Sequence, residues 1–429
     1  MRAANPHAKL RKLLGYGAAA ALLVLAPTAA SAGKFKVLHS FCAKRGCSDG
    51  QTPLAPLVGD GAGDFFGTAY RGGVEDRGTA FELIDAGDGK YKFKLIYAFR
   101  SQQPNNGGLT VDIAGNLYGF DQAGNFYKLS YGFGAHHDKW GETLLSVGLP
   151  GATGSLTYAG ASSGSPWDGS SPLYGVTGDG GQNGKGSVFS LVPNGNQWAV
   201  SDLYDFCSQQ NCPDGEGPSG GLLLAASGQL YGTTVEGGTR GGGVAFQLSG
   251  SGDQWTESTL YNYCSQKNCS DGDSPFGNLA GDASGNLFGV TAAGGQCKRY
   301  PEGCGVLFQL SDTGGSWSET VLHRFCSERD CRDGSTPEGG VSLDDSGNLI
   351  GTTVSGGGHD IDGQGLGGGV VYKFSGGVFN VLHAFCAAAN CADGERPYSN
   401  GIENSAGVLL GTASGGGAFQ AGDVYAVQP

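Results

Sequence analysis

Two loop segments of the sequence gather polar side chains that could do acid–base chemistry. The first is "GGGHDIDGQG" at 356–365, and the second is "QCKRYPEGC" at 296–304. Histidine, tyrosine, arginine and paired carboxylates are the groups that a polysaccharide lyase or a glycosidase uses to move protons and stabilise charge. The candidate catalytic residues are therefore His359, Tyr300, Arg299, Asp360 and Glu302.

The carboxylates of "HDIDGQG" also suggest a cation. Asp360 and Asp362 alternate along the chain and are followed by a glycine, as in acidic calcium loops, although the later ligands of an EF-hand are missing. Calcium is thus a candidate cofactor, with these two residues as candidate metal ligands. The competing interpretation of each single residue is an ordinary solvated side chain in a glycine-rich loop.

Further polar residues lie in equivalent loops elsewhere and are candidates for ligand binding. They are Arg71, Asp76, Asp121, Glu236, Arg240 and Lys298.

The elements that position these loops come from an internal repeat. "DASGNLFGVTAAGG" at 282–295 has near-copies at 225 and 344, and the phrase is chemically bland. Aligned on the glycine of "LYG", the chain holds seven units of about 50–60 residues, a period typical of propeller blades. The seven glycines are Gly67, Gly119, Gly175, Gly232, Gly289, Gly351 and Gly411.

Each unit contains four strand-like pieces and no helical period. The first two are joined by Asp-x-x-Gly, as a type I turn prefers, and the third alternates apolar and polar residues. The glycine of the second piece is expected to allow a close backbone approach. The last unit ends on a third strand at 423–427, so "KFKVLHSF" at 34–41 can supply its missing fourth strand. The sequence predicts an all-β, seven-bladed β-propeller with four-stranded blades, closed by the N-terminal strand, in preference to a linear solenoid.

The pattern "DxSGNLYGTTxxGG…GGVxFxL" resembles the GloVer tandem repeat of exported bacterial proteins, and its "DxxGNLY" core is similar to NHL-type propellers. The resemblance covers essentially all of the chain after the leader. It implies an exported repeat protein, and it implies neither a reaction nor catalytic residues.

The first 32 residues have the layout of a secretory signal peptide: four basic residues, an apolar run at 13–25, and small residues ending at Ala32. We expect a single propeller domain over 33–429, secreted or periplasmic, monomeric and not inserted in a membrane. Loss of the leader's four basic residues moves the net charge from −13 to −17. This acidity argues against a nucleic-acid partner.

The twelve cysteines fall into six local pairs, five of them with the same spacing. In an exported chain this predicts six structural disulfides, because zinc would need four ligands close together and redox catalysis favours C-x-x-C. The pairs are Cys42–Cys47, Cys207–Cys212, Cys264–Cys269, Cys297–Cys304, Cys326–Cys331 and Cys386–Cys391.

Five aspartates follow the regular cysteine pairs, each before a glycine. They are either turn-capping residues or an acidic ring around the channel. Three histidines share a strand position with tyrosines of other units, which indicates packing. The aspartates are Asp49, Asp214, Asp271, Asp333 and Asp393; the histidines are His39, His323 and His383.

Loops from strand two to three, and from strand four to the next blade, emerge on one face of a propeller. In this chain these loops carry the disulfides, and they are shortest near blade two and longest in blades five and six. The sequence therefore predicts binding of an extracellular ligand, a glycan or a partner protein, on this face. The alternative is a polysaccharide lyase or glycosidase with its cleft over blades five and six. A third possibility, from fold analogy, is a calcium-dependent lactonase-like hydrolase.

Overall fold

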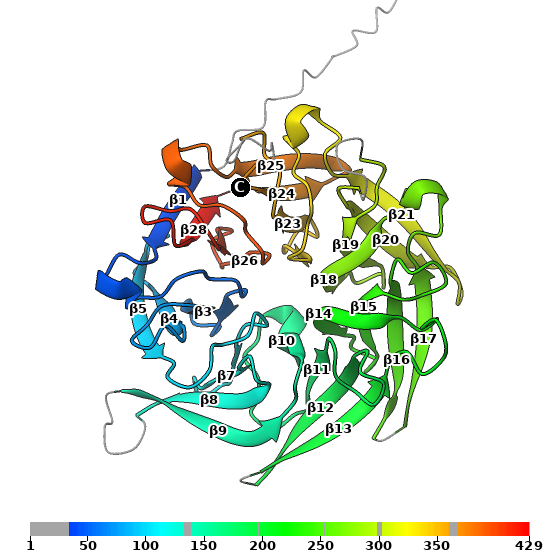
Figure 1. Cartoon of the computed structure of the whole chain (residues 1–429), viewed down its shortest axis with the longest axis horizontal. Coiled ribbons are helices and arrows are strands. Elements are labelled where there is room, and N and C mark those ends of the chain that lie inside the picture. Colours follow the sequence, from blue (N-terminus) through cyan, green and yellow to red (C-terminus); the bar gives the residue numbers. More distant parts are fainter. Residues whose placement is uncertain are drawn as a thin grey trace, which may run out of the picture. The chain divides into compact units, whose positions relative to one another are not determined.

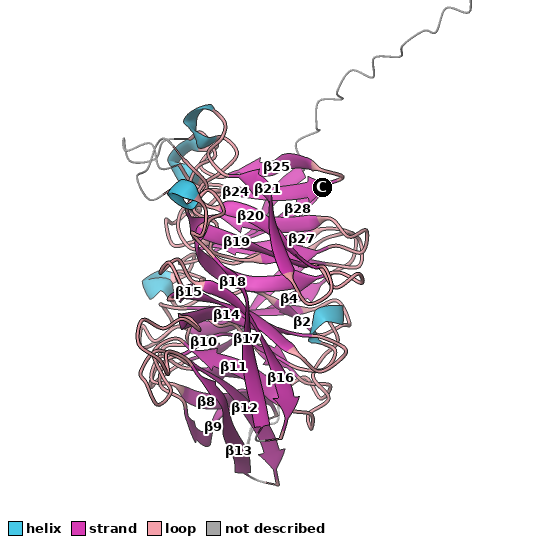
Figure 2. Cartoon of the chain, turned by 90° about the vertical axis from the view of Figure 1, so that its right-hand side faces the viewer, coloured by secondary structure: helices cyan, strands magenta, loops and turns pink. Residues whose placement is uncertain are grey.

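The computed structural model of the chain describes residues 34–132, 139–195, 197–252, 254–297, 303–359 and 367–428. Twenty-eight strands form seven antiparallel sheets of four strands each. Viewed down the axis, the sheets stand side by side in a ring with their first strands innermost (Figure 1). From the side, loops project from both faces of the ring (Figure 2). The predicted all-β, seven-bladed propeller is confirmed.

The blades follow the chain order, four strands each. Blade one consists of β2 (Val58–Gly59), β3 (Phe65–Ala69), β4 (Thr79–Asp85) and β5 (Tyr91–Ala98), and blade two of β6 (Thr110–Val111), β7 (Leu117–Phe120), β8 (Asn125–Tyr131) and β9 (Trp140–Gly148). Blade three consists of β10 (Ala152–Thr157), β11 (Leu173–Thr177), β12 (Ser187–Asn194) and β13 (Gln197–Asp205), and blade four of β14 (Glu216–Leu224), β15 (Leu230–Glu236), β16 (Val244–Ser251) and β17 (Gln254–Asn262).

Blade five consists of β18 (Asp273–Gly281), β19 (Leu287–Ala293), β20 (Val306–Asp312) and β21 (Trp317–Arg324), and blade six of β22 (Val341–Leu343), β23 (Leu349–Thr353), β24 (Val370–Ser375) and β25 (Val378–Ala384). Blade seven consists of β26 (Ile402–Glu403), β27 (Leu409–Ala413), β28 (Asp423–Gln428) and β1 (Lys34–Ser40). Four short 3-10 turns lie in disulfide loops, namely η1 (Arg45–Cys47), η3 (Lys267–Cys269), η4 (Arg329–Cys331) and η5 (Ala389–Cys391). A fifth, η2 (Ala161–Ser163), lies on the face of the ring opposite these loops.

The ring is closed by the N-terminal strand, as predicted. β1 pairs antiparallel with β28, from Lys34 opposite Gln428 to Ser40 opposite Asp423. Phe35 stacks on His383 of blade six at 3.6 Å between ring centroids and also contacts Tyr425. The first described strand therefore completes the last blade, and no blade is left with three strands.

The glycine of each second strand makes room for a side chain, and not for the backbone approach that the sequence suggested. A Cβ at Gly232 would lie 2.6 Å from the Phe246 ring and 2.9 Å from Leu222. Phe246 belongs to the third strand and Leu222 to the first strand of the same blade. The same arrangement recurs at Gly289 with Phe308 and Leu279. The repeated phrase thus builds the interior of each blade.

The Asp-x-x-Gly turns form as predicted. In blade five the Gly285 amide donates to the Asp282 carbonyl at 3.1 Å, which closes the turn. The Asp282 side chain accepts bonds from the amides of Ser284 and Asn286 at 2.8 and 2.9 Å. These bonds hold the first two strands of the blade in register.

Neighbouring blades are joined on their outer side by two kinds of side-chain pair. Where a fourth strand carries histidine, the next blade presents phenylalanine: His39 stacks on Phe93 at 3.5 Å and His323 on Phe379 at 3.8 Å. Where a fourth strand carries tyrosine, the next blade presents glutamate, and the Tyr97 hydroxyl donates to Glu142 at 3.0 Å. The residue types on adjacent blades therefore match one another.

In the blades that are followed by a regular disulfide loop, the histidine or tyrosine also holds that loop. His323 Nε2 lies 3.0 Å from Asp333 Oδ2, and the Tyr261 hydroxyl donates to Asp271 at 2.9 Å. Asp333 also accepts the amides of Ser327 and Glu328 at 3.0 and 3.2 Å. The aspartate is buried and caps its own loop, as the turn interpretation predicted. It therefore fixes a loop of the disulfide-bearing face, called the upper face below, to the outer strand of its blade.

We predict that deletion of β1 destabilises the whole ring. A chain starting at Phe41 lacks the strand that pairs with β28 and the Phe35 contacts, and its thermal midpoint should fall by about 5 °C or more relative to a chain starting at Gly33. Thermal unfolding of the two chains measures this difference. An unchanged midpoint would contradict closure by the N-terminal strand.

We also predict that the protein loses stability as the pH rises from about 4.5 to 7. Burial raises the pKa of Glu257 and Glu319 from 4.5 to about 7, with Asp214 and Asp271 adding to the two shifts. A raised pKa means that the folded state keeps a proton that the unfolded chain has lost, so each group favours folding at low pH only. Burial raises the pKa of Asp423 in the same direction, also to about 7.

The measurement is the thermal midpoint at pH 5, 6, 7 and 8 for the parent chain and the variant Glu257→Gln/Glu319→Gln. The variant should lose less stability than the parent over this range. The control is Glu236→Gln, which makes the same chemical change at an exposed position. Identical pH profiles for all three proteins would contradict the assignment.

Candidate functional site

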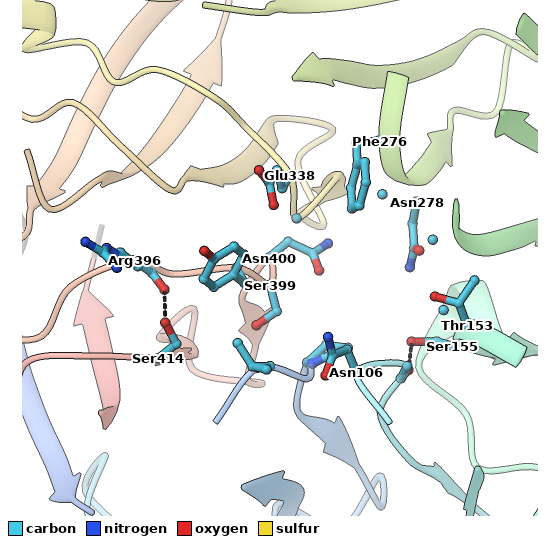
Figure 3. Close-up of a pocket in the computed structure, with 18 of the residues that line it drawn as sticks. Asn106, Thr153, Ser155, Phe276, Asn278, Glu338, Arg396, Ser399, Asn400 and Ser414 are labelled. Carbon is cyan, nitrogen blue, oxygen red and sulfur yellow. Dashed lines mark hydrogen bonds between the residues drawn. The ribbon is translucent and has the colours of Figure 1, made fainter. Parts of the chain in front are cut away.

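A cavity of about 620 Å³ lies on the axis of the ring. The cavity occupies the end of the channel beside the disulfide loops, and residues from all seven blades line it. Its volume lies in the range of ligand pockets, roughly 300–1,000 Å³. Figure 3 shows side chains from several blades around one opening, among them Phe276, Asn278 and Glu338.

One repeat position supplies the upper wall of this axial cavity. In blades one to six it lies three residues before the apolar residue of the first strand, in blade seven three residues before Gly401, and it differs in every blade. In order from blade one it is Leu54, Asn106, Thr153, Ser219, Phe276, Glu338 and Tyr398. All but Ser219 line the cavity, where blade four contributes Gly220 instead. The same position of the scaffold thus recurs in every blade, while the side chain that it carries changes from blade to blade.

Two residues further along, each first strand reaches the waist of the channel. There blades one, three, five and seven present Pro56, Ser155, Asn278 and Asn400, which line both the axial cavity and a second cavity below it. The remaining three blades carry glycine at this position.

Glycines just above and at the waist let neighbouring first strands touch through their backbones. A Cβ at Gly220 would meet the backbone of Gly277, and one at Gly277 would meet that of Gly340. All three glycines have φ near +75°, which other residues rarely adopt. The first strands can therefore approach the axis closely only with glycine at these positions.

Some of the polar groups of the axial cavity have no hydrogen-bond partner among the described residues. Within the described residues the side chains of Glu338, Asn400 and Tyr398 make no hydrogen bond, whereas Asn278 accepts the Gly221 amide. Burial raises the pKa of the Glu338 carboxyl. Burial and the nearby Glu338 also raise the pKa of Tyr398, against the effect of Arg396. The cavity therefore offers free hydrogen-bonding groups beside two aromatic rings.

The second cavity, of about 590 Å³, lies at the opposite mouth. It is partly lined by the connection between β10 and β11, through Tyr158, Ala161 and Gly164. Trp167 of the same connection is buried between blades two and three, where it packs on Tyr118 and Trp198. This connection thus stabilises the blade two–three junction.

The ligand-binding candidates that lie within the described residues do not line the axial cavity. Arg71, Glu236 and Arg240 are exposed loop residues, and the exposed Asp76 accepts the Gly72 amide at 2.8 Å. Asp121 is buried and accepts the amides of Ala123 and Asn125, both at 2.9 Å. The contacts of Asp121 are those of a residue that holds a turn.

His359 lies in a separate groove on the outer side of blade six. This groove is also lined by Glu328, Arg332 and Phe379, away from the axis. The other candidates of the two long loops lie outside the described residues. They are Lys298, Arg299, Tyr300, Glu302, Asp360 and Asp362.

All six predicted disulfides are present, each within its own loop. Groups that could ligate a metal occur among the described residues, for example Cys264, Cys269 and Asp273, and each of them includes disulfide-bonded cysteines. Their sulfur atoms are therefore not available as thiolate ligands. No helix in the described part of the chain is long and apolar enough to cross a membrane.

Sequence reasoning missed the axial cavity because it looked for unusual residues in long loops. The signal was present at a single repeat position, where the seven aligned units carry seven different residues, in five of them directly after a proline. A residue such as Phe276 looks like ordinary strand packing until the seven units are placed around one axis.

Comparison with known proteins agrees with the repeat pattern and the fold. The family model described as the Gloeobacter/Verrucomicrobia repeat matches residues 147–362, half of the chain. A comparison with curated proteins finds no match.

Among solved structures, the extracellular domain of a putative hybrid two-component system from B. thetaiotaomicron superposes with a TM-score of 0.53 at 12% identity, covering 92% of this chain and 41% of that one. An α-L-arabinanase from Penicillium chrysogenum, complexed with arabinobiose, gives a TM-score of 0.43 at 12% identity over 74% of this chain and 91% of that one. The propeller domain of Cps50 (Swd1) from Myceliophteria thermophila gives 0.48 at 10% identity over 89% and 97%. At these identities the likeness concerns the fold alone.

We predict that the buried aspartates are essential to the disulfide loops of the upper face. Asp333→Asn places an amide where Oδ2 now faces His323 and Ser327, and it should cost about 1–3 kcal/mol of unfolding free energy. Denaturant unfolding measures this cost. The control Asp330→Asn changes an exposed carboxylate in the same loop. Equal stability of the two variants would contradict a capping role.

Proposed function

This chain belongs to the Gloeobacter/Verrucomicrobia repeat family, and we propose that it is an exported β-propeller that binds a glycan in the axial cavity. The observation that carries the proposal is the repeat position that differs in all seven blades and lines one cavity. Packing alone favours the same residue in every unit, as it does at the glycines of the second strands. A surface that must fit an asymmetric ligand requires different residues.

The chemistry of the cavity favours a carbohydrate. A sugar ring has an apolar C–H face and a rim of hydroxyl groups that both donate and accept hydrogen bonds. Phe276 and Tyr398 offer aromatic surfaces for the C–H face. Glu338, Asn400 and Asn106 offer acceptors and donors that no described residue occupies. Each of these groups gains a partner when hydroxyl groups enter the cavity.

The proposed location supports such a ligand. Residues 1–32 are proposed to be a cleaved signal peptide, and six disulfides are typical of proteins in oxidising compartments outside the cytoplasm. Polysaccharides of cell walls and of the surroundings are accessible there. The acidic surface of the chain disfavours strongly anionic polymers by long-range repulsion, so a neutral glycan is the favoured class.

The test is a binding screen of the mature protein against immobilised arabinan, xylan, mannan, β-glucan, chitin and pectin. We expect at least one neutral polysaccharide to bind. Phe276→Ala and Glu338→Gln should each weaken that binding about tenfold or more, since each removes a contact inside the cavity.

The matched control is Phe419→Ala, which removes an exposed phenylalanine outside the cavity and should leave binding unchanged. Product analysis in the same screen separates binding from catalysis, because a lyase or glycosidase would release oligosaccharides. Binding that is unaffected by both cavity variants, or the absence of binding to every polysaccharide, would contradict the proposal.

A further inference from the structure

We infer that the axial cavity takes the end of a glycan chain and not its interior. This inference rests on the proposed function and specifies which part of the ligand is recognised. Three features carry it: walls from all seven blades, fixed polar side chains at the waist, and polar groups in the cavity that have no hydrogen-bond partner among the described residues.

The walls of the cavity form a closed circle. Every blade contributes at least one lining residue, and the first strands of neighbouring blades touch at their glycines. The seam between blade seven and blade one is closed as well, because the Thr412 hydroxyl donates to the Ala55 carbonyl at 3.3 Å. An open cleft would let a polymer enter and leave in the same plane. A closed wall admits only a chain end or a short branch, directed along the axis.

The waist of the channel presents side chains to a chain end that enters along the axis. Pro56, Ser155, Asn278 and Asn400 lie there and line both the axial cavity and the lower one. The Ser155 hydroxyl donates to the Gly107 carbonyl at 2.6 Å, and Asn278 accepts the Gly221 amide, so both side chains are held in place. Below the waist, Ala161 and Gly164 of the blade-three connection line the second cavity. A terminal sugar that reaches the waist therefore meets fixed polar groups.

The unpaired groups can distinguish a terminal sugar from an internal one. A terminal residue carries one hydroxyl that is replaced by a glycosidic bond in every internal residue. Glu338 and Asn400 lie in the cavity with no hydrogen-bond partner among the described residues, and they can pair with that hydroxyl. A site that bonds a hydroxyl group strongly rejects an analogue without it, because its own polar groups then stay unpaired. Recognition of the end thus follows from the same residues that recognise the sugar.

The experiment uses linear oligosaccharides of two to eight units, prepared from each polysaccharide of the panel, and isothermal titration calorimetry. We expect the affinity per molecule to become constant, within about threefold, beyond three or four units. Methylation of the free hydroxyl groups of the non-reducing residue, or reduction of the other end to the alditol, should weaken binding at least tenfold for whichever end is bound. Binding to the polymer should then scale with the number of chain ends.

Two outcomes would overturn the inference while the proposed function stands. One is an affinity that grows in proportion to chain length. The other is equal binding of free oligosaccharides and of oligosaccharides blocked at both ends. Absence of binding to every oligosaccharide and polysaccharide would instead contradict the proposed function itself.

Variants of the lining residues test whether the end of the glycan binds in the axial cavity. Glu338→Gln should reduce the preference for free over blocked ends, whereas the exposed Glu236→Gln should not change it. Phe276→Tyr keeps the aromatic face and should retain most of the affinity that Phe276→Ala loses, which separates lost stacking from unfolding. An unchanged end preference in Glu338→Gln would contradict recognition by the cavity.

Discussion

Seven first strands converge on one axis, and glycine backbones set how closely they can approach. At Gly220 and Gly277 a side chain would collide with the backbone of the next blade, and φ near +75° disfavours any other residue. The close contact narrows the channel to a waist and closes the wall above it. In six of the seven blades the variable side chain just above the waist lines the cavity. The position of the candidate site therefore follows from a constraint on the scaffold.

The outer side of the ring is held by a different kind of contact, which also serves the upper face. A histidine or tyrosine at one strand position binds the aspartate of its own disulfide loop and meets the next blade. His39 stacks on Phe93 while it contacts Asp49, and His323 stacks on Phe379 while it contacts Asp333. One side chain thus couples loop, strand and neighbouring blade. The loops that surround the axial cavity are fixed at their base as a result, which reduces the ordering cost of ligand binding.

The two roles of the repeat are separated along each first strand. The second-strand glycines are the same in all seven blades because each lies against a side chain of the third strand. The variable residue of the first strand lines the open cavity in six blades, so it is free to differ, and it is leucine, phenylalanine, glutamate or tyrosine in different blades. The ring is therefore nearly symmetric, while the side chains that line the axial cavity are not. A ligand that is itself asymmetric needs such an arrangement.

The sequence by itself determined the blades, their order, the closing strand and the cysteine pairs. These features depend on local spacing: a period of about 57 residues, alternation within strands, and cysteines five or seven residues apart. It also identified the histidine and tyrosine position as structural, although not that the partner of His39 would be Phe93. Only the tertiary structure decided which side chains share a cavity. Leu54, Phe276 and Tyr398 are separated by more than a hundred residues and meet only when the ring closes, whereas His359, conspicuous in the sequence, lies in an outer groove. Local pattern predicts local geometry, but convergence on an axis is a property of the closed ring.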